Sequence, residues 1–169
     1  MRNQKGQALV ETALIIPLLL LLVMGIFEFG RAMYIKNTLN NAARGGVRVA
    51  AVTPRYDATT NITGLQAASA QSLAGCGTFT GPNSLVFQFI CDSIYNGIPK
   101  AEVTVDIEIT DLDPLIAAGL SHGDKVKIKL TWSNFQFITP LGSLTALIGG
   151  GDSILNPGNI IGEASMRYE

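Results

Sequence analysis

Residues 8–27 form an almost unbroken apolar run near the N-terminus, and this run constrains the fold more than any other feature of the chain. A helix rises about 1.5 Å per residue, so about twenty apolar residues cover the roughly 30 Å hydrocarbon core of a bilayer. We therefore predict a membrane span over residues 8–27. A secretory signal peptide would have a shorter apolar core and a small-x-small cleavage site, and the sequence after Gly25 offers no such site.

Charged groups flank this span unevenly. Arg2 and Lys5 precede it, and positive charge at the end of a span tends to remain in the cytoplasm. We therefore expect a single pass with a cytoplasmic N-terminus and an exported remainder, although Arg31 and Lys36 on the far side weaken the argument.

A helical stripe continues beyond the span. Small and apolar residues recur at spacings of three and four: Ala32, Ile35, Leu39, Ala42, Gly46 and Val49. The pattern predicts one helix to about Val52, amphipathic in its outer half and ended by Thr53-Pro54. Its small residues would let a sheet approach the backbone closely. Pro17 removes one hydrogen bond within the span and predicts a kink there.

Alternation of apolar and polar residues predicts strands over residues 102–110, 125–132 and 160–168. The polar face of the first is acidic and that of the second is basic, so antiparallel pairing would place opposite charges across from each other. We predict an α+β fold: a long N-terminal helix packed on a small antiparallel β-sheet head. The expected domains are the helix, which occupies residues 7–52, and an exported head at 53–169.

The other segments have weaker patterns. Residues 61–74 predict a second helix that ends at Gly75 and Gly77, and Leu85–Cys91 is apolar and aromatic enough for a buried strand. Asp113-Pro114 predicts a short helix that closes at Gly119. Residues 135–139 extend the second strand or add one, and the glycine-rich residues 140–159 predict a loop.

Two cysteines, Cys76 and Cys91, would lie in an oxidising compartment if the head is exported. A disulfide between them would stabilise the fold by roughly 3 kcal/mol in the chain-entropy model. Two buried free thiols are the alternative, favoured if the head is cytoplasmic.

Composition argues against several functional classes. The chain has 12 Lys+Arg against 13 Asp+Glu and no dense basic stretch, so we expect no nucleic-acid partner. His122 is the only histidine, and the sequence contains neither a phosphate-binding loop nor a nucleophile elbow. We therefore predict no enzyme activity, no cofactor and no metal site. Two loop groups could offer oxygen ligands to calcium, but their spacing does not follow the helix-loop-helix pattern: Asp111 with Asp113, and Asp152 with Asn156 and Asn159.

Charged residues near the two ends of the span need an explanation. Glu11 is the one charged residue within the apolar run, and a lone carboxylate there costs a few kcal/mol unless it is protonated, reaches the headgroups or finds a partner. Glu28 and Arg31 are three residues apart on the helix, which predicts a local ion pair worth a few tenths of a kcal/mol.

The segment that begins Gly6-Gln7-Ala8-Leu9-Val10-Glu11 resembles a prepilin peptidase site, in which cleavage follows glycine and glutamate is the fifth mature residue. With Gly25-Ile26-Phe27-Glu28-Phe29-Gly30-Arg31 and Asn41-Ala42-Ala43-Arg44-Gly45-Gly46 it is similar to the TadE-like pseudopilin family. The resemblance covers roughly residues 5–52 and, faintly, the C-terminus. Thr12 and the Gly45-Gly46 pair depart from the family pattern, in which an aromatic and an acidic residue are frequent.

The resemblance implies a minor pilin or pseudopilin of the tight-adherence (Flp) pilus, with a pilin-like fold and a prepilin leader at residues 1–6. Its implied partners are a prepilin peptidase, which cleaves between Gly6 and Gln7, the bacterial inner membrane, and other pilins that contact the N-terminal helix. Glu11 would pair with the free amine of a neighbouring subunit. The alternative is an exported binding or adhesion module held by a single-span anchor and not incorporated in a filament.

Overall fold

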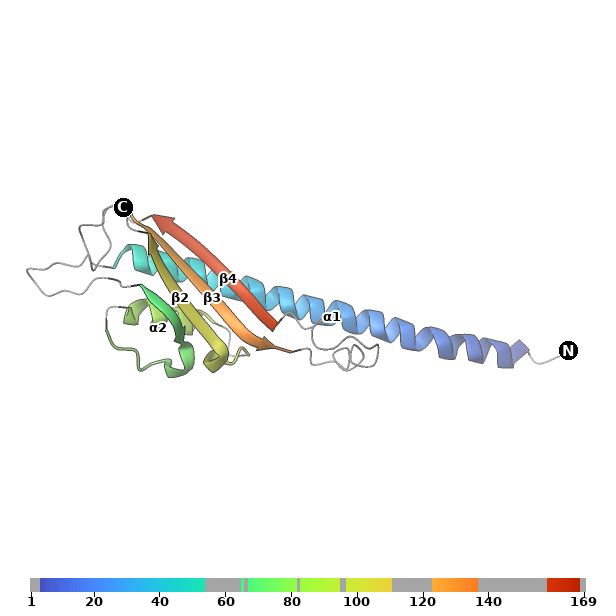
Figure 1. Cartoon of the computed structure of the whole chain (residues 1–169). Helices are drawn as coiled ribbons and strands as arrows, with labels where there is room; N and C mark the ends of the chain where they lie inside the picture. The colour runs from blue at the N-terminus through green and yellow to red at the C-terminus, as the bar shows by residue number, and fades with distance from the viewer. Residues whose placement is uncertain are drawn as a thin grey trace, which may run out of the picture. The chain divides into compact units, whose positions relative to one another are not determined.

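The structure, a computed structural model, describes residues 4–53, 65, 67–81, 83–94, 97–110, 123–136 and 158–167. Its elements, labelled in Figure 1, are helix α1 (Gln4–Ala51), strand β1 (Ala68–Ser72), turn η1 (Leu73–Gly75), helix α2 (Ser84–Ser93), turn η2 (Lys100–Glu102), and strands β2 (Val103–Thr110), β3 (Lys125–Phe135) and β4 (Gly158–Arg167). The predicted α+β fold, a long N-terminal helix with a small antiparallel sheet, is confirmed.

The chain divides into two compact units. The first, the span unit, comprises Met1–Met33 and Gln136–Gly158, and the second, the sheet unit, comprises Tyr34–Phe135 and Asn159–Glu169. The first part of α1 belongs to the span unit and the second part to the sheet unit.

In the span unit, α1 presents apolar side chains to the surroundings on all sides. Between Leu9 and Phe29 most large apolar residues are exposed, which would be costly in water but suits a lipid environment. The helix continues through Pro17. Thr12 Oγ1 donates a hydrogen bond to the Ala8 carbonyl oxygen at 2.8 Å, as small polar side chains in apolar helices commonly do.

In the sheet unit, the outer half of α1 buries one side. Four residues of the predicted stripe are buried, namely Ile35, Leu39, Ala42 and Gly46, whereas Ala32 and Val49 are only partly buried. The buried side also includes Ala43, Val47 and Ala50, which the stripe did not contain. Gly46 lies against Ile90 of α2 and Ile128 of β3, because a Cβ added there would be 3.0 and 3.3 Å from their side chains. The small residues on the stripe therefore allow close packing of the sheet and α2 on this helix, as the sequence predicts.

The sheet has the strand order β1-β2-β3-β4. In the antiparallel register of β2 and β3, Asp106 faces Lys129 and Glu108 faces Lys127, so the predicted opposition of acidic and basic faces is confirmed. The other faces of these strands are apolar and buried, from Val103, Val105 and Ile107 on β2 and from Val126, Ile128, Leu130 and Trp132 on β3. β3 extends to Phe135, three residues beyond the predicted strand.

Lys127 binds carboxylates on both neighbouring strands. Its Nζ lies 3.1 Å from Glu163 Oε2 on β4 and 3.9 Å from Glu108 Oε2 on β2. The hydrogen bond to Glu163, and then the charges of Glu163 and Glu108, raise the pKa of Lys127 above its ordinary value of 10.5 and outweigh desolvation. The ammonium group therefore links β2, β3 and β4.

This pKa shift predicts a pH dependence of stability. Because the pKa of Lys127 is raised on folding, its contribution is fully present below about pH 10.5 and is lost as the pH rises through the folded-state value. The difference in urea midpoint between wild type and Lys127→Met should accordingly shrink above this pH. Lys125→Met is the control, because Lys125 lies on the same strand face and forms no ion pair within the described chain. A constant difference across this pH range would contradict the assignment.

The two edge strands of the sheet, β1 and β4, avoid pairing with strands of other molecules in different ways. β4 lies along the second half of α1 (Figure 1), and a Cβ at Gly162 would come within 2.6 Å of the Leu39 carbonyl carbon. The Glu163 backbone N–H donates to Asn40 Oδ1 at 3.2 Å, so α1 binds a backbone group of this strand. β1 is short and polar and has a register shift between Ala68 and Gln71, where Ala70 has φ 48°. Short, irregular edges of this kind disfavour uncontrolled strand pairing.

Two predicted elements are wrong. Within the segment predicted as a helix (61–74), Ala68–Ser72 is strand β1, and residues 61–64 and 66 lie outside the described residues. The edge of β2 provides hydrogen-bond partners, and the Ala70 N–H also donates to Asp106 Oδ1 at 2.7 Å. These contacts outweigh a weak helix propensity.

The second error is α2, where Leu85–Cys91 was predicted as a strand. Its buried residues, Val86, Phe87, Ile90 and Cys91, follow a helical spacing, and Leu85 and Phe89 remain partly exposed. A strand would have placed Phe87 and Ile90 on opposite faces. The predicted helix at 113–119 and the segment 137–157 lie outside the described residues.

Candidate processing and assembly site

Gly6, Gln7 and Glu11 lie within the first turns of α1. Helical geometry places Gln7 and Glu11, four residues apart, on the same side of the helix. All three are exposed, and a Cβ added at Gly6 would meet no atom within 4 Å. Glu11 forms no ion pair within the part of the chain that the structure describes. Its carboxylate is therefore available to a group from another molecule.

The accessibility of Gly6 and Gln7 has a chemical consequence. A peptidase must reach the peptide bond between them, and no described side chain of the protein packs against this glycine. Cleavage there would create an α-amino group at Gln7, and a helix N-terminus already carries partial positive charge from its unpaired N–H groups. A carboxylate group would pair favourably with this positively charged helix N-terminus.

Glu28 and Arg31 form the predicted ion pair, but the structure adds a contact that the sequence analysis missed. Arg31 Nε lies 3.1 Å from Glu28 Oε2, and the Glu28 side chain is only 1% exposed. Arg31 Nη2 also donates to the backbone carbonyl of Gln136, 105 residues further along the chain. The guanidinium group therefore connects α1 to the residue that follows β3. No local sequence signal could have shown this contact.

Removal of the guanidinium group should be more harmful than removal of the carboxylate. Arg31→Met removes the cation that lies 3.1 Å from the buried Glu28 carboxylate, and we expect a loss of about 2 kcal/mol in unfolding free energy. Glu28→Gln should cost less, because Arg31 is 20% exposed and water can solvate it. Urea unfolding of the full chain in detergent would measure both. Equal losses would contradict the difference in burial as the cause.

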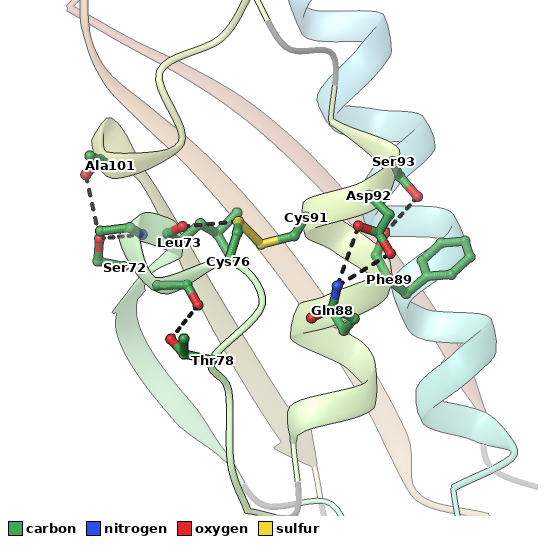
Figure 2. The surroundings of a disulfide bond; sticks show 12 residues. Ser72, Leu73, Cys76, Thr78, Gln88, Phe89, Cys91, Asp92, Ser93 and Ala101 are labelled. Carbon is green, nitrogen blue, oxygen red and sulfur yellow. Dashed lines mark hydrogen bonds between the residues drawn. A yellow bond between two sulfur atoms is a disulfide. The ribbon is translucent and has the colours of Figure 1, made fainter.

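Cys76 and Cys91 lie far from the N-terminal site in sequence and belong to the sheet unit. Their Sγ atoms are joined at 2.01 Å, which links the turn after η1 to α2 (Figure 2). Ser72 accepts a hydrogen bond from the Ala74 N–H at the start of η1, so the turn that positions Cys76 is locally ordered.

Within the residues that the structure describes, no group of three or more His, Cys, Asp or Glu residues could hold a metal ion. His122 and the residues considered for calcium, apart from Asn159, lie outside the described residues.

The fold and the helix together define a class: α+β proteins with one N-terminal helix that is long and apolar enough to cross a membrane. Residues 6–48 match the model of the family described as TadE-like protein, which agrees with the resemblance read from the sequence. The match lies within α1 and does not extend to the sheet. No curated protein and no solved structure matches the chain.

Proposed function

We propose that this chain is a minor pilin or pseudopilin of the tight-adherence (Flp) pilus. A prepilin peptidase removes residues 1–6, and residues 8–27 then hold the protein in the bacterial inner membrane with residues 53–169 exported. The protein next joins other pilins through α1, at the base or tip of a pilus that serves adhesion or secretion. Its function is assembly, without catalysis or a cofactor.

One observation supports this proposal above the others. The family match begins at Gly6, and the one acid of the apolar run, Glu11, follows Gln7 by four residues and is exposed on α1. A charged side chain at the centre of a bilayer costs about 3 kcal/mol, and less near its edge. Cleavage after Gly6 would provide a compensating charge, because the new α-amino group of a neighbouring subunit can pair with the Glu11 carboxylate.

Export would also account for the cysteines. An oxidising compartment favours the disulfide between Cys76 and Cys91. The reducing cytoplasm would keep both cysteines as free thiols. We therefore propose that this disulfide forms after export of the head.

N-terminal mass analysis of the protein from cells that contain an active prepilin peptidase tests the proposal. We expect wild type to begin at Gln7, methylated or unmethylated, and Gly6→Ala to keep its leader. Gly25→Ala is the matched control, because this glycine lies on the same helix and a Cβ there also meets nothing within 4 Å. It should be processed normally. An uncleaved wild-type chain would refute the proposal and favour the anchored binding module.

A second measurement separates assembly from processing. Glu11→Leu should be cleaved but incorporated poorly into pili, because the pairing carboxylate is gone. Glu11→Asp keeps the charge and should assemble better than Glu11→Leu. An anchored binding module would tolerate both substitutions, so normal incorporation of cleaved Glu11→Leu would contradict the role assigned to Glu11.

A further inference from the structure

The exposed side of α1 stays apolar for two turns beyond Phe27, where the span predicted from the sequence ends. Six uncharged, exposed residues share an arc of about 160° around the helix on this side. We call them the outer apolar face: Ile26, Phe27, Phe29, Gly30, Met33 and Tyr34. The exposed fraction of its large side chains lies between 43% (Met33) and 68% (Phe29), and a Cβ added at Gly30 would meet no atom within 4 Å. An apolar surface of this continuity indicates a contact with something other than water.

The charged residues that interrupt the apolar sequence lie off this face. Glu28 is the first charged residue after the run, and its side chain is 1% exposed, while that of Arg31 is 20% exposed. The two side chains pair at 3.1 Å, and Arg31 also donates to the Gln136 carbonyl oxygen. Charged groups at membrane depth are usually satisfied in this way, by one another and by backbone carbonyls. The first charge in the sequence is therefore a poor marker of where lipid contact ends.

The same side of α1 becomes polar directly after Tyr34. Its next exposed residues are all polar or charged: Asn37, Asn41, Arg44 and Arg48. The helix is continuous across this change. A change from apolar to polar along one side of a helix is expected where its surroundings change from lipid to water.

Helical dimensions place this change near the outer surface of a bilayer. With Ala8 at the inner edge of the hydrocarbon core and an average helix tilt of about 20°, Phe29 would lie about 30 Å and Tyr34 about 37 Å across the membrane. The core is about 30 Å thick, and the headgroup regions bring the total to about 40–45 Å. Phe29 would therefore lie at the edge of the core and Tyr34 among the headgroups, where tyrosine rings are enriched.

We propose that lipid covers the outer apolar face, so that the membrane-embedded surface of α1 extends to Tyr34. The inference rests on the membrane anchoring in the proposed function and not on cleavage after Gly6. Lipid is favoured over a protein partner because the face continues the exposed apolar surface of residues 9–23 and ends at the depth of the headgroups. The aromatic rings then fix the depth at which α1 lies in the membrane, as interfacial aromatic residues do.

Hydroxyl-radical footprinting of the full-length wild type in phosphatidylcholine nanodiscs tests the proposal. A low protein-to-lipid ratio leaves most discs with a single chain, so that another copy cannot protect the face. Two pairs of like residues provide the comparison: in the protein alone Phe29 is 68% and Phe89 39% exposed, and Met33 is 43% and Met166 41% exposed. In nanodiscs we expect Phe29 to be modified roughly fivefold more slowly than Phe89, because the bilayer core contains almost no water. Met33 should also be modified more slowly than Met166.

Quenching by brominated lipid identifies the covering molecule. Gly30→Trp and Asn41→Trp are a matched pair, because both residues are exposed on the same side of α1, about three turns apart. Bromine near the headgroup end of the acyl chains should quench the emission of Gly30→Trp and leave that of Asn41→Trp unchanged. Trp132, the single tryptophan of the wild type, is 5% exposed and gives the common background. The wild-type footprint needs no substitution, so it remains a test even if a variant misfolds.

Two results would overturn the inference. If Phe29 and Met33 are modified in nanodiscs as fast as Phe89 and Met166, lipid contact ends near Phe27. If both residues are protected but Gly30→Trp is quenched no more than Asn41→Trp, protein covers the face instead of lipid.

Leu22 separates this inference from the anchoring in the proposed function. It is 59% exposed and is compared with Leu85, which is 63% exposed. Protection of Leu22 without protection of Phe29 would refute the inference alone. Modification of Leu22 as fast as Leu85 would show that α1 does not enter the membrane, and the anchoring would fail as well. An uncleaved chain with a protected outer apolar face would refute the pilin proposal and leave the lipid contact standing.

Discussion

Gly162→Ala should lower the free energy of unfolding by about 3 kcal/mol, at the upper end for an overpacked core. A Cβ at this position would lie 2.6 Å from the Leu39 carbonyl carbon and 2.7 Å from the Asn40 nitrogen, both backbone atoms of α1. A helix backbone cannot move without disturbing its own hydrogen bonds, so β4 would have to separate from α1. That separation would also weaken the hydrogen bond from Glu163 N–H to Asn40 Oδ1.

Two other glycines of the sheet unit are the comparison. A Cβ at Gly45 would lie even closer to its neighbour, 2.2 Å from Phe89 Cε1, but this ring is 39% exposed and can rotate away. At Gly46 the nearest atoms are the end of the Ile90 side chain at 3.0 Å. We therefore expect Gly45→Ala and Gly46→Ala to cost less than Gly162→Ala. Urea unfolding followed by Trp132 emission measures all three. A larger loss at Gly45 would mean that the Phe89 ring is held in place.

Loss of the disulfide should have a similarly large effect. Cys76 and Cys91 are 15 residues apart, and for a loop of this size the chain-entropy model gives about 3 kcal/mol. We expect Cys76→Ala/Cys91→Ala to unfold at a correspondingly lower urea concentration than the oxidised wild type. α2 should be affected first, because the bond links it to the turn after η1, as Figure 2 shows. Amide hydrogen exchange should then show faster exchange in α2 than in β2 and β3.

The reduced wild-type protein is the control for the disulfide experiment. It has the same side chains as the oxidised protein and differs only in the cross-link, so its stability should approach that of the double alanine variant. Cys91 is fully buried, and an additional loss in the alanine variant would measure its packing. Equal stability of oxidised and reduced wild type would show that the bond does not constrain the unfolded chain.

The long elements could be predicted because their patterns extend over many residues. The stripe on α1 and the alternation in β2 and β3 repeat often enough to distinguish a period near 3.6 from a period of two. Alternation alone does not fix the register between β2 and β3, but charge favours the observed one. In that register Asp106 faces Lys129 and Glu108 faces Lys127. Local and tertiary preferences agree in these segments.

The short elements could not be predicted, because their patterns extend over too few residues. Leu85–Cys91 contains too few residues to separate the two periods, and its β-branched and aromatic side chains favour a strand. Packing of Phe89 and Ile90 against Gly45 and Gly46 and the bond from Cys91 favour a helix instead. β1 is the opposite case, in which a segment of weak helical pattern pairs with the open edge of β2.

The sequence by itself determined the apolar helix with Glu11 near its start and the charged faces of β2 and β3. These properties belong to single residues and to regular spacings, so they can be read without coordinates. Only the tertiary structure decided the identity of β1 and α2, the contact of Arg31 with Gln136, and the close approach of Gly162 to α1. Each of these depends on contacts between segments that are far apart in the sequence. A local sequence pattern carries no information about the energies of such contacts.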